Sequence, residues 1–242
     1  MRLTYRGPVL VTGGSSELGM ALARALQDEG ARTVSACRSP EGLERCRAAG
    51  LDCLPFGEPE DLPERCREAF GESPAHLADL MHSRFESLIA GASPDAIAEW
   101  AAGDVGRRAR LVRAVGRSML ARRFGRCVFA SSGAAACPAA GQGYYAAAKL
   151  AGEALYRSLA VELAGRGVTA CSLRLSWIDA GRGRDFLERR REAAERRMPS
   201  GRLVGMDEAV RALAFLLSAE AASVNATEVT QDGGLSATKT KI

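Results

Sequence analysis

Several residue types are scarce in this sequence of 242 residues, and each scarcity excludes a class of protein. Two histidines are present and the seven cysteines show no Cys-x-x-Cys spacing, so no metal site is expected. The odd cysteine count also argues against a disulfide framework, and we expect small buried cysteines in a reducing compartment. Aromatic residues make up 5% of the chain, whereas alanine and glycine are abundant, which favours close packing of helices on a sheet.

Charge and hydropathy argue against two classes of partner. The net charge of +4 is too small to indicate nucleic acid, and the basic residues form no stripe interleaved with aromatics. No apolar run reaches the roughly 18 residues that a membrane span needs. The amino terminus, MRLTYRGPVLVTGG, leads directly into a strand-like segment, so we expect no signal peptide and a cytoplasmic location.

Short apolar runs alternate with helical stretches rich in Ala, Leu and Arg, and no linker or repeat marks a domain boundary. This alternation predicts a single α/β domain over residues 1–242, with a doubly wound parallel sheet of Rossmann type and helices on both faces. Ligands of such sheets bind at the carboxyl ends of the strands, where the strand order reverses. The predicted strands are 8–12, 32–37, 52–56, 78–82, 126–132, 168–176 and 227–234, and the predicted helices are 17–30, 42–50, 104–123, 144–165 and 206–220.

A glycine-rich turn, VTGGSSELG, lies between the first predicted strand and the first predicted helix. Such a turn lets the backbone approach a dinucleotide pyrophosphate, which then faces the positive end of the helix. Gly13 and Gly19 mark the ends of the turn, and the hydroxyls of Ser15 and Ser16 can donate to phosphate oxygens. A turn that only joins a strand to a helix is the structural alternative.

The spacing of this turn resembles the nucleotide-binding loop of the short-chain dehydrogenase/reductases, which usually reads T-G-x-x-x-G-x-G. Glu17 stands here in place of the middle glycine. A carboxylate in the first turn of a helix is favoured by the helix dipole, so capping is one interpretation. As a loop residue, the same carboxylate would crowd an anionic cofactor. The pteridine-reductase branch of the family also replaces this glycine, but with arginine.

The stretch ASSGAAACPAAGQGYYAAAK resembles the catalytic segment of the same family, whose serine lies 13 residues before its tyrosine. Ser132, Tyr145 and Lys149 match that segment, and the tyrosine and lysine share one helix face. The resemblance implies that Ser132 bonds the substrate oxygen and that Tyr145 is the general acid or base. It also implies that Lys149 binds the nicotinamide ribose and lowers the tyrosine pKa from its usual value near 10. A packed tyrosine beside a solvated lysine is the alternative.

Further segments resemble the cofactor-binding parts of the family. TQDGGLSA resembles the closing strand and turn, while Ser176 stands for a usual glycine and Ile178 for the aliphatic residue that meets the carboxamide. Cys37 and Arg38 replace the acid that reads the ribose in NAD enzymes, and a guanidinium favours a 2′-phosphate. NADP(H) is therefore predicted over NAD(H), with Glu17 as the counter-evidence. The predicted cofactor-binding residues are Gly13, Ser15, Ser16, Leu18, Gly19, Arg38, Tyr145, Lys149, Ser176 and Ile178.

Three positions depart from the family pattern. The usual Asn-Asn-Ala-Gly stretch reads HSRF at 82–85, the usual helical asparagine falls at Gly106, and the usual aspartate after the third strand falls at Gly57. These departures motivate a second hypothesis, a catalytically weakened member that senses a dinucleotide or supports a partner protein. We interpret His82 as a packing or hydrogen-bonding residue, with a replacement proton relay as the alternative.

The segment 179–205 takes the place of the family's substrate lid and carries many arginines. We interpret it as a solvated helix in which Glu188, Glu192 and Glu195 offset arginines three or four residues away, with a cationic lid over an acidic substrate as the alternative. The resemblance predicts an NADP(H)-dependent oxidoreductase that interconverts a carbonyl and an alcohol, or reduces a pterin-like C=N bond, by hydride transfer. The resemblance also implies a small-molecule substrate. Because the segments 104–123 and 146–164 match the helices that pair subunits in the family, it implies a homodimer or homotetramer as well.

Overall fold

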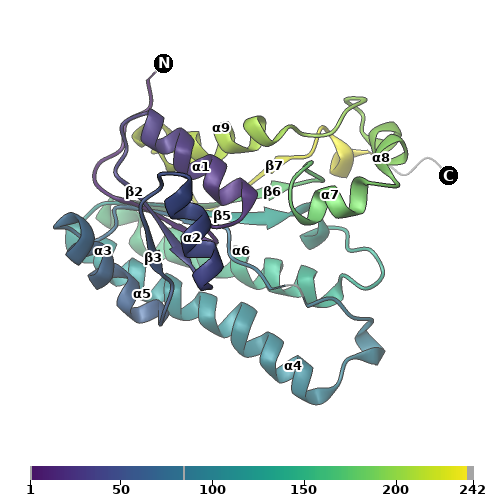
Figure 1. Cartoon of the computed structure of the whole chain (residues 1–242), viewed down its shortest axis with the longest axis horizontal. Helices are drawn as coiled ribbons and strands as arrows, with labels where there is room; N and C mark the ends of the chain where they lie inside the picture. Colours follow the sequence, from purple (N-terminus) through teal and green to yellow (C-terminus); the bar gives the residue numbers. More distant parts are fainter. Residues whose placement is uncertain (1, 84, 239–242) are drawn as a thin grey trace.

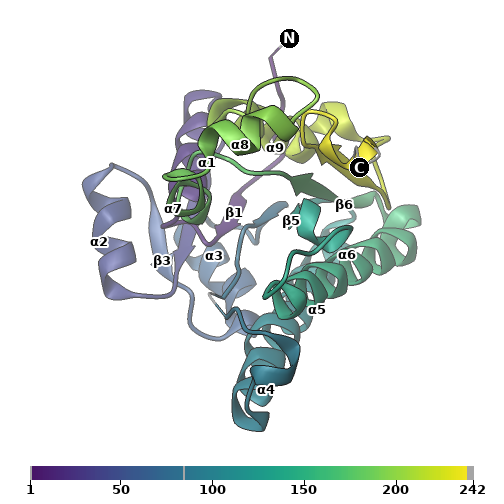
Figure 2. The same cartoon turned by 90° about the vertical axis from the view of Figure 1, so that its right-hand side faces the viewer.

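Seven parallel strands form one sheet in the computed structural model, which describes residues 2–83 and 85–238, without the side chains of 182, 185 and 186. The strand order is β3-β2-β1-β4-β5-β6-β7, and helices lie on both sides of the sheet (Figure 1 and Figure 2). The predicted doubly wound α/β fold is therefore confirmed. The strands are β1 Val9–Thr12, β2 Thr33–Cys37, β3 Cys53–Pro55, β4 His76–Asp79, β5 Gly125–Ser132, β6 Val168–Leu175 and β7 Glu228–Gln231.

The helices differ from the prediction in two places. The predicted helix 104–123 begins earlier, because α4 runs through a π-helical segment, Ala101–Gly106, directly into α5. Helix α3 was not predicted, and the solvated helix expected within 179–205 is instead two short helices, α7 and α8. The helices are α1 Glu17–Asp28, α2 Pro40–Ala48, α3 Leu62–Phe70, α4 Pro94–Trp100, α5 Arg107–Arg122, α6 Gly143–Leu163, α7 Arg182–Leu187, α8 Arg191–Arg197 and α9 Met206–Leu217.

The fourth strand also differs from the prediction, because it spans His76–Asp79 and not 78–82. Both terminal residues of β4 are polar, yet all four of its residues are buried. A sequence-based prediction that assigns charged and polar residues to the protein surface cannot identify the bounds of such a strand correctly. Hydrogen bonds from other elements satisfy both polar side chains, which is what burial of a polar group requires.

Two apolar layers hold the helices to the sheet. Successive strand residues face opposite sides, so Leu10 packs in the layer under α3, α5 and α6, whereas Val9 and Val11 pack in the layer under α1 and α9. Each fully buried leucine or valine contributes roughly 1.5–3 kcal/mol relative to an exposed one. The cysteines are reduced, and Cys137 is exposed, in contrast to the expectation that they are buried.

The order of the strands positions the site. β1 lies between β2 and β4, so the strand order of the sheet reverses at β1. The loops that leave the carboxyl ends of β1 and β4 therefore part to opposite sides and leave room for a ligand. Helices α7 and α8, which lie in the segment predicted to form a lid, are near these ends (Figure 2).

Candidate active site

A cleft of about 1460 Å³ lies at the carboxyl ends of the central strands. Five groups of residues form its walls: the turn after β1, the segment after β4, the segment from the end of β5 to α6, the segment from the end of β6 through α8, and the segment after β7. The predicted site residues that line it are Ser16, Leu18, Ser132, Tyr145, Lys149, Ser176 and Ile178. Residues far apart in the sequence thus meet in one shared cavity.

Ser132 is the last residue of β5, which points it into the cleft. Its hydroxyl accepts a hydrogen bond from the Ala134 backbone N–H at 3.2 Å, which caps the short 3₁₀ turn that follows the strand. The same hydroxyl bonds the phenol of Tyr145. The predicted pair is therefore in direct contact.

Tyr145 lies in the first turn of α6 and is half-buried. Burial raises the pKa of Tyr145 above its usual value, while the hydrogen bond from Ser132 and the charge of Arg108 lower this pKa in part. The imidazole of His82 meets the phenol ring edge-on, with 6.3 Å between ring centroids. His82 is thus a packing neighbour of the tyrosine, as its first interpretation predicts.

Lys149 lies one helical turn after Tyr145, and 3% of it is exposed. Its ammonium donates to the Ala130 carbonyl at 2.7 Å and lies 5.5 Å from the centroid of the Tyr145 ring. Burial, followed by the charge of Arg108, lowers the pKa of Lys149 to about 7. The expected lowering of the tyrosine pKa is therefore not found in this structure, because desolvation by burial is the largest effect on the phenol.

The glycine-rich turn has the backbone geometry that a dinucleotide loop requires. Gly13 has φ +69°, and a Cβ there would lie 2.9 Å from the Leu80 carbonyl oxygen. A Cβ on Gly19 would lie 2.5 Å from the Gly13 oxygen, so α1 packs directly on the turn. Ser16 caps α1, since its hydroxyl accepts from the Gly19 N–H at 3.0 Å and donates to the Gly13 carbonyl at 2.8 Å.

Two predicted cofactor residues face away from the cleft wall. Ser15 lies against the start of α2, where a Cβ on Gly42 would be 2.7 Å from its hydroxyl, and it bonds the Cys37 thiol. Arg38 is exposed just after β2 and donates to the His82 carbonyl at 3.1 Å. A 2′-phosphate would meet Arg38 at this edge of the site, and its role there stays a prediction.

Ser176 supplies a test of whether a dinucleotide fits the cleft. Its hydroxyl is buried and has no hydrogen-bond partner among the residues that the structure describes. A buried polar atom without a partner costs free energy unless a ligand or water satisfies it. Ser176 and Ile178 follow β6 and line the same cleft as Tyr145. The unpaired hydroxyl and the close backbone approach at Gly13 both fit a dinucleotide.

Glu17 opens α1 at the place where the turn faces the cleft. Its carboxylate accepts two hydrogen bonds from Arg184 of α7, at 2.9 and 2.7 Å. The expected crowding of an anionic cofactor is therefore offset by a guanidinium from the lid. Two predicted acids of the lid pair four residues away on their own helix, Glu192 with Arg196 and Glu195 with Arg191.

Sequence reasoning missed a buried polar group next to Lys149. The predicted helical position, Gly106, ends the π-helical segment and has no side chain, whereas Asp104 of that segment faces the site. Its carboxylate accepts from the Ser83 N–H at 2.8 Å and from the Ser83 hydroxyl. A π-helical segment often marks a functional position, but no pattern in the sequence signals it. Of the predicted stretch 82–85, Arg84 lies outside the described residues.

Comparisons with known proteins agree with this geometry. The family model described as enoyl-(acyl carrier protein) reductase matches residues 87–236, which is more than half of the chain. The 3-oxoacyl-[acyl-carrier-protein] reductase FabG of Pseudomonas aeruginosa is 30% identical over 96% of this chain and 99% of the relative. The chain belongs to the short-chain dehydrogenase/reductase family. This is a family of oxidoreductases, so the predicted enzyme class is confirmed as well.

Other relatives support the same assignment. FabG of Escherichia coli strain K12 is 29% identical over 96% of this chain and 99% of that protein. The TT0495 protein of Thermus thermophilus superposes with a TM-score of 0.87 at 26% identity and covers 97% of this chain and 100% of its own. A 3-oxoacyl (acyl-carrier-protein) reductase of Agrobacterium tumefaciens C58, with NADP bound, has a TM-score of 0.83 at 25% identity over 94% of this chain and 93% of its own.

Within the described residues, no helix is long and apolar enough to cross a membrane.

Proposed function

We propose that this short-chain dehydrogenase/reductase is an NADP(H)-dependent enzyme that interconverts a carbonyl group and an alcohol group of a small molecule. The observation that carries the proposal is the convergence of Ser132, Tyr145 and Lys149 on the cleft that also holds the glycine-rich turn. The direct bond between Ser132 and Tyr145 supports it further. A packed tyrosine beside a solvated lysine does not agree with a lysine that is almost fully buried.

Each of the three side chains has a distinct task. The hydroxyls of Ser132 and Tyr145 are close enough to donate to one substrate oxygen, which fixes the carbonyl in the cleft. Tyr145 gives its proton to that oxygen in reduction and takes it back in oxidation. A protonated Lys149 stabilises the phenolate that remains after the proton has left. The bound dinucleotide supplies or takes up the hydride.

The choice of dinucleotide rests on the end of β2. Cys37 presents no carboxylate to a ribose, and Arg38 offers an exposed guanidinium to a 2′-phosphate. The NADP-bound relative supports this preference. We expect NADPH to protect the chain from thermal unfolding more than NADH does, and we expect Arg38→Gln to remove most of the difference. Equal protection, or greater protection by NADH, contradicts the choice.

The relatives suggest the first substrate to assay. Several of them are 3-oxoacyl-[acyl-carrier-protein] reductases, so a 3-oxoacyl thioester is the first substrate to test. Ketones, aldehydes and pterins follow, and the absorbance of NADPH measures its oxidation. The pterin alternative stays a prediction. Absence of NADPH binding at millimolar concentration favours instead a non-catalytic member that supports a partner protein. Binding without turnover of any substrate favours the dinucleotide-sensing alternative.

Association of subunits through α5 and α6 is part of the proposal. Leu120, Leu150 and Val161 are large apolar side chains on these two helices, and each is at least 39% exposed. Such residues are typical of surfaces that pair across a two-fold axis. We expect a dimer or tetramer in size-exclusion chromatography with light scattering, whereas a monomer contradicts the proposal.

A further inference from the structure

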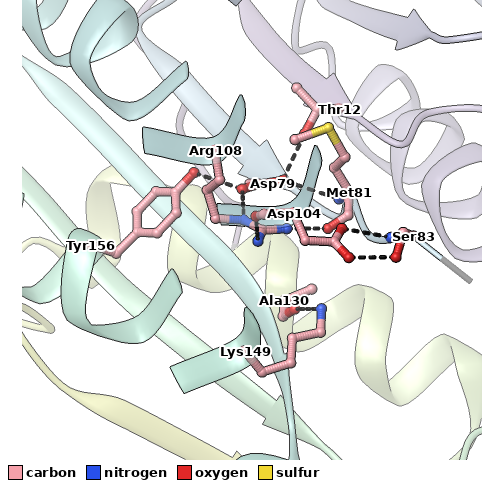
Figure 3. Close-up of polar contacts among 9 residues, drawn as sticks. All are labelled: Thr12, Asp79, Met81, Ser83, Asp104, Arg108, Ala130, Lys149 and Tyr156. Carbon is pink, nitrogen blue, oxygen red and sulfur yellow. Dashed lines mark hydrogen bonds and ion pairs between the residues drawn. The ribbon is translucent and has the colours of Figure 1, made fainter. Parts of the chain in front are cut away.

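A buried carboxylate lies beneath the active site, at the end of β4. Asp79 is fully buried, and its two oxygens accept four hydrogen bonds from different elements (Figure 3). These bonds satisfy the carboxylate in the interior, as burial of such a group requires. The donors are the Thr12 hydroxyl at 2.9 Å, the Met81 N–H at 3.0 Å, Arg108 Nε at 2.9 Å and the Tyr156 hydroxyl at 3.1 Å.

Arg108 is the cationic partner of Asp79, and 1% of it is exposed. Every nitrogen of its guanidinium is used: Nε bonds Asp79, Nη1 donates to the Asp104 carbonyl at 2.7 Å, and Nη2 donates to the Met81 carbonyl. The Asp104 carbonyl belongs to the π-helical segment, so the distorted helix and the arginine hold one another in place. The charge of Arg108 is therefore fixed in one position.

Phe129 connects this ion pair to Lys149. It is paired in register with Asp79 on the neighbouring strand, so both side chains lie on the same face of the sheet. The Phe129 ring centroid is 4.7 Å from Arg108 Cζ and 4.9 Å from Lys149 Nζ. Gly152 allows this approach, since a Cβ there would lie 2.5 Å from the ring. Two buried cations thus share one aromatic ring.

The ammonium of Lys149 lacks a bonded carboxylate in the part of the chain that the structure describes. Its hydrogen-bond partner there is the Ala130 carbonyl, apart from the Arg108–Asp79 cluster (Figure 3). Arg108 opposes a charge on Lys149, whereas the nearby acids favour one, and the effect of Arg108 is larger than that of any single acid. The charged or titratable groups that face Lys149 are Arg108 of α5, Asp79 of β4, Asp104 of the π-helical segment, and Tyr145 and Glu153 of its own helix.

We propose that Arg108, fixed by Asp79, is a positioning residue that acts through Lys149: across the Phe129 ring that both cations contact, its charge disfavours the ammonium form of Lys149. The proposed function gives this effect a use, because it needs the ammonium form of Lys149 beside the Tyr145 phenolate, and Arg108 sets the pH range in which that form is present. The catalytic effect rests on that function, but the protonation of Lys149 can be measured without turnover.

The composition of the chain makes this measurement direct. Its lysines are Lys149, Lys239 and Lys241, so Lys239→Arg with Lys241→Arg leaves a single lysine. In that background, the ¹³C-labelled ε-carbon of Lys149 gives one NMR signal whose shift follows its protonation. We expect a titration midpoint far below the usual value of about 10.4 for lysine. We expect Arg108→Gln to raise the midpoint by roughly one pH unit or more, and Arg108→Lys to keep it near that of the parent.

Three comparisons make the test decisive. Arg122→Gln is the matched control, because Arg122 ends the same helix and pairs with Glu72 far from the site, so it leaves the midpoint unchanged. An unchanged midpoint in Arg108→Gln, or an equal rise in Arg108→Lys, overturns the proposal. If Arg108→Gln leaves Asp79 unpaired and does not fold, Asp79→Asn with Arg108→Gln replaces it, and its midpoint must lie above that of Asp79→Asn alone.

Turnover separates the two claims. The pH profile of kcat/KM should follow the midpoint of Lys149, so that its alkaline limb moves up in Arg108→Gln and not in Arg122→Gln. A midpoint that moves while the profile stays in place supports the electrostatic coupling and contradicts the role of Lys149 in the proposed function. A profile that moves without the midpoint overturns the coupling itself.

Discussion

Glu17 and Arg184 form a two-point ion pair that joins the nucleotide turn to the lid helix, with nitrogen–oxygen distances of 2.9 and 2.7 Å. The carboxylate stands at the positive end of α1, where the family has a glycine and where dinucleotide phosphates are expected. The arginine also lies 3.6 Å from Asp179 of the lid. The lid therefore brings a cation to the carboxylate of the turn, which would otherwise repel a phosphate.

The first prediction is that Arg184→Gln weakens NADPH binding by about fivefold, because an exposed ion pair contributes on the order of 1 kcal/mol. Glu17→Gln should strengthen binding by a similar factor, and the double variant should bind about as tightly as the parent. Fluorescence titration of NADPH measures all three. Arg211→Gln, which breaks an exposed pair on α9, is the control. Tighter binding by Arg184→Gln would show that the arginine does not compensate Glu17.

The second prediction concerns the stability cost of burying Lys149. Its folded pKa of about 7 lies below the unfolded value of 10.5, so the unfolded state binds more protons between these values and the free energy of unfolding rises with pH. Lys149→Met should remove about 2–3 kcal/mol of that rise between about pH 6 and about pH 9. Urea unfolding at both pH values measures it.

Arg157→Met is the control for this prediction, because Arg157 lies on the same helix and pairs with Glu228 at the surface. Its pH dependence of unfolding should equal that of the parent. If the free energy of unfolding depends on pH in the same way in Lys149→Met and in the parent, burial of Lys149 does not carry the predicted cost in stability.

The third prediction concerns His76 at the opposite end of the sheet. Its Nδ1 bonds the Leu217 carbonyl at 2.8 Å and its Nε2 accepts from the Arg6 N–H at 3.0 Å, which defines one neutral tautomer. Burial lowers the pKa of His76 to about 4 from 6.5, so stability is lost as pH falls between these values.

Replacement by glutamine should remove this loss. We expect His76→Gln to lose about 2 kcal/mol less stability than the parent between about pH 8 and about pH 5, although it is less stable at neutral pH. If the free energy of unfolding falls equally with decreasing pH in His76→Gln and in the parent, the histidine is not held neutral by burial.

The convergence of the catalytic residues could be predicted because each signal is local. A serine at the end of an apolar strand points to the carboxyl edge of the sheet, and a tyrosine and a lysine four residues apart share one helix face. The position of the glycine-rich turn follows for the same reason. These elements needed no knowledge of distant contacts, and the structure places them around one cleft.

The buried ion pair and the pKa directions could not be predicted in the same way. Asp79 and Arg108 are separated by 29 positions, and no pattern in the sequence indicates that they pair in the interior. The π-helical segment depends on these contacts and leaves no pattern of its own. The shifts at Tyr145 and Lys149 arise from desolvation, which depends on what the fold packs around them.

Adjacent tyrosines allow the most direct test of the account. Tyr145 bonds Ser132 in the cleft, whereas the Tyr144 hydroxyl donates to the Ile89 carbonyl at 3.3 Å. With a substrate found in the panel, Tyr145→Phe should lower kcat by about 10²–10⁴-fold and leave the Kd for NADPH nearly unchanged, while Tyr144→Phe should keep most of the activity. Full activity in Tyr145→Phe would contradict the central claim that this phenol passes the proton.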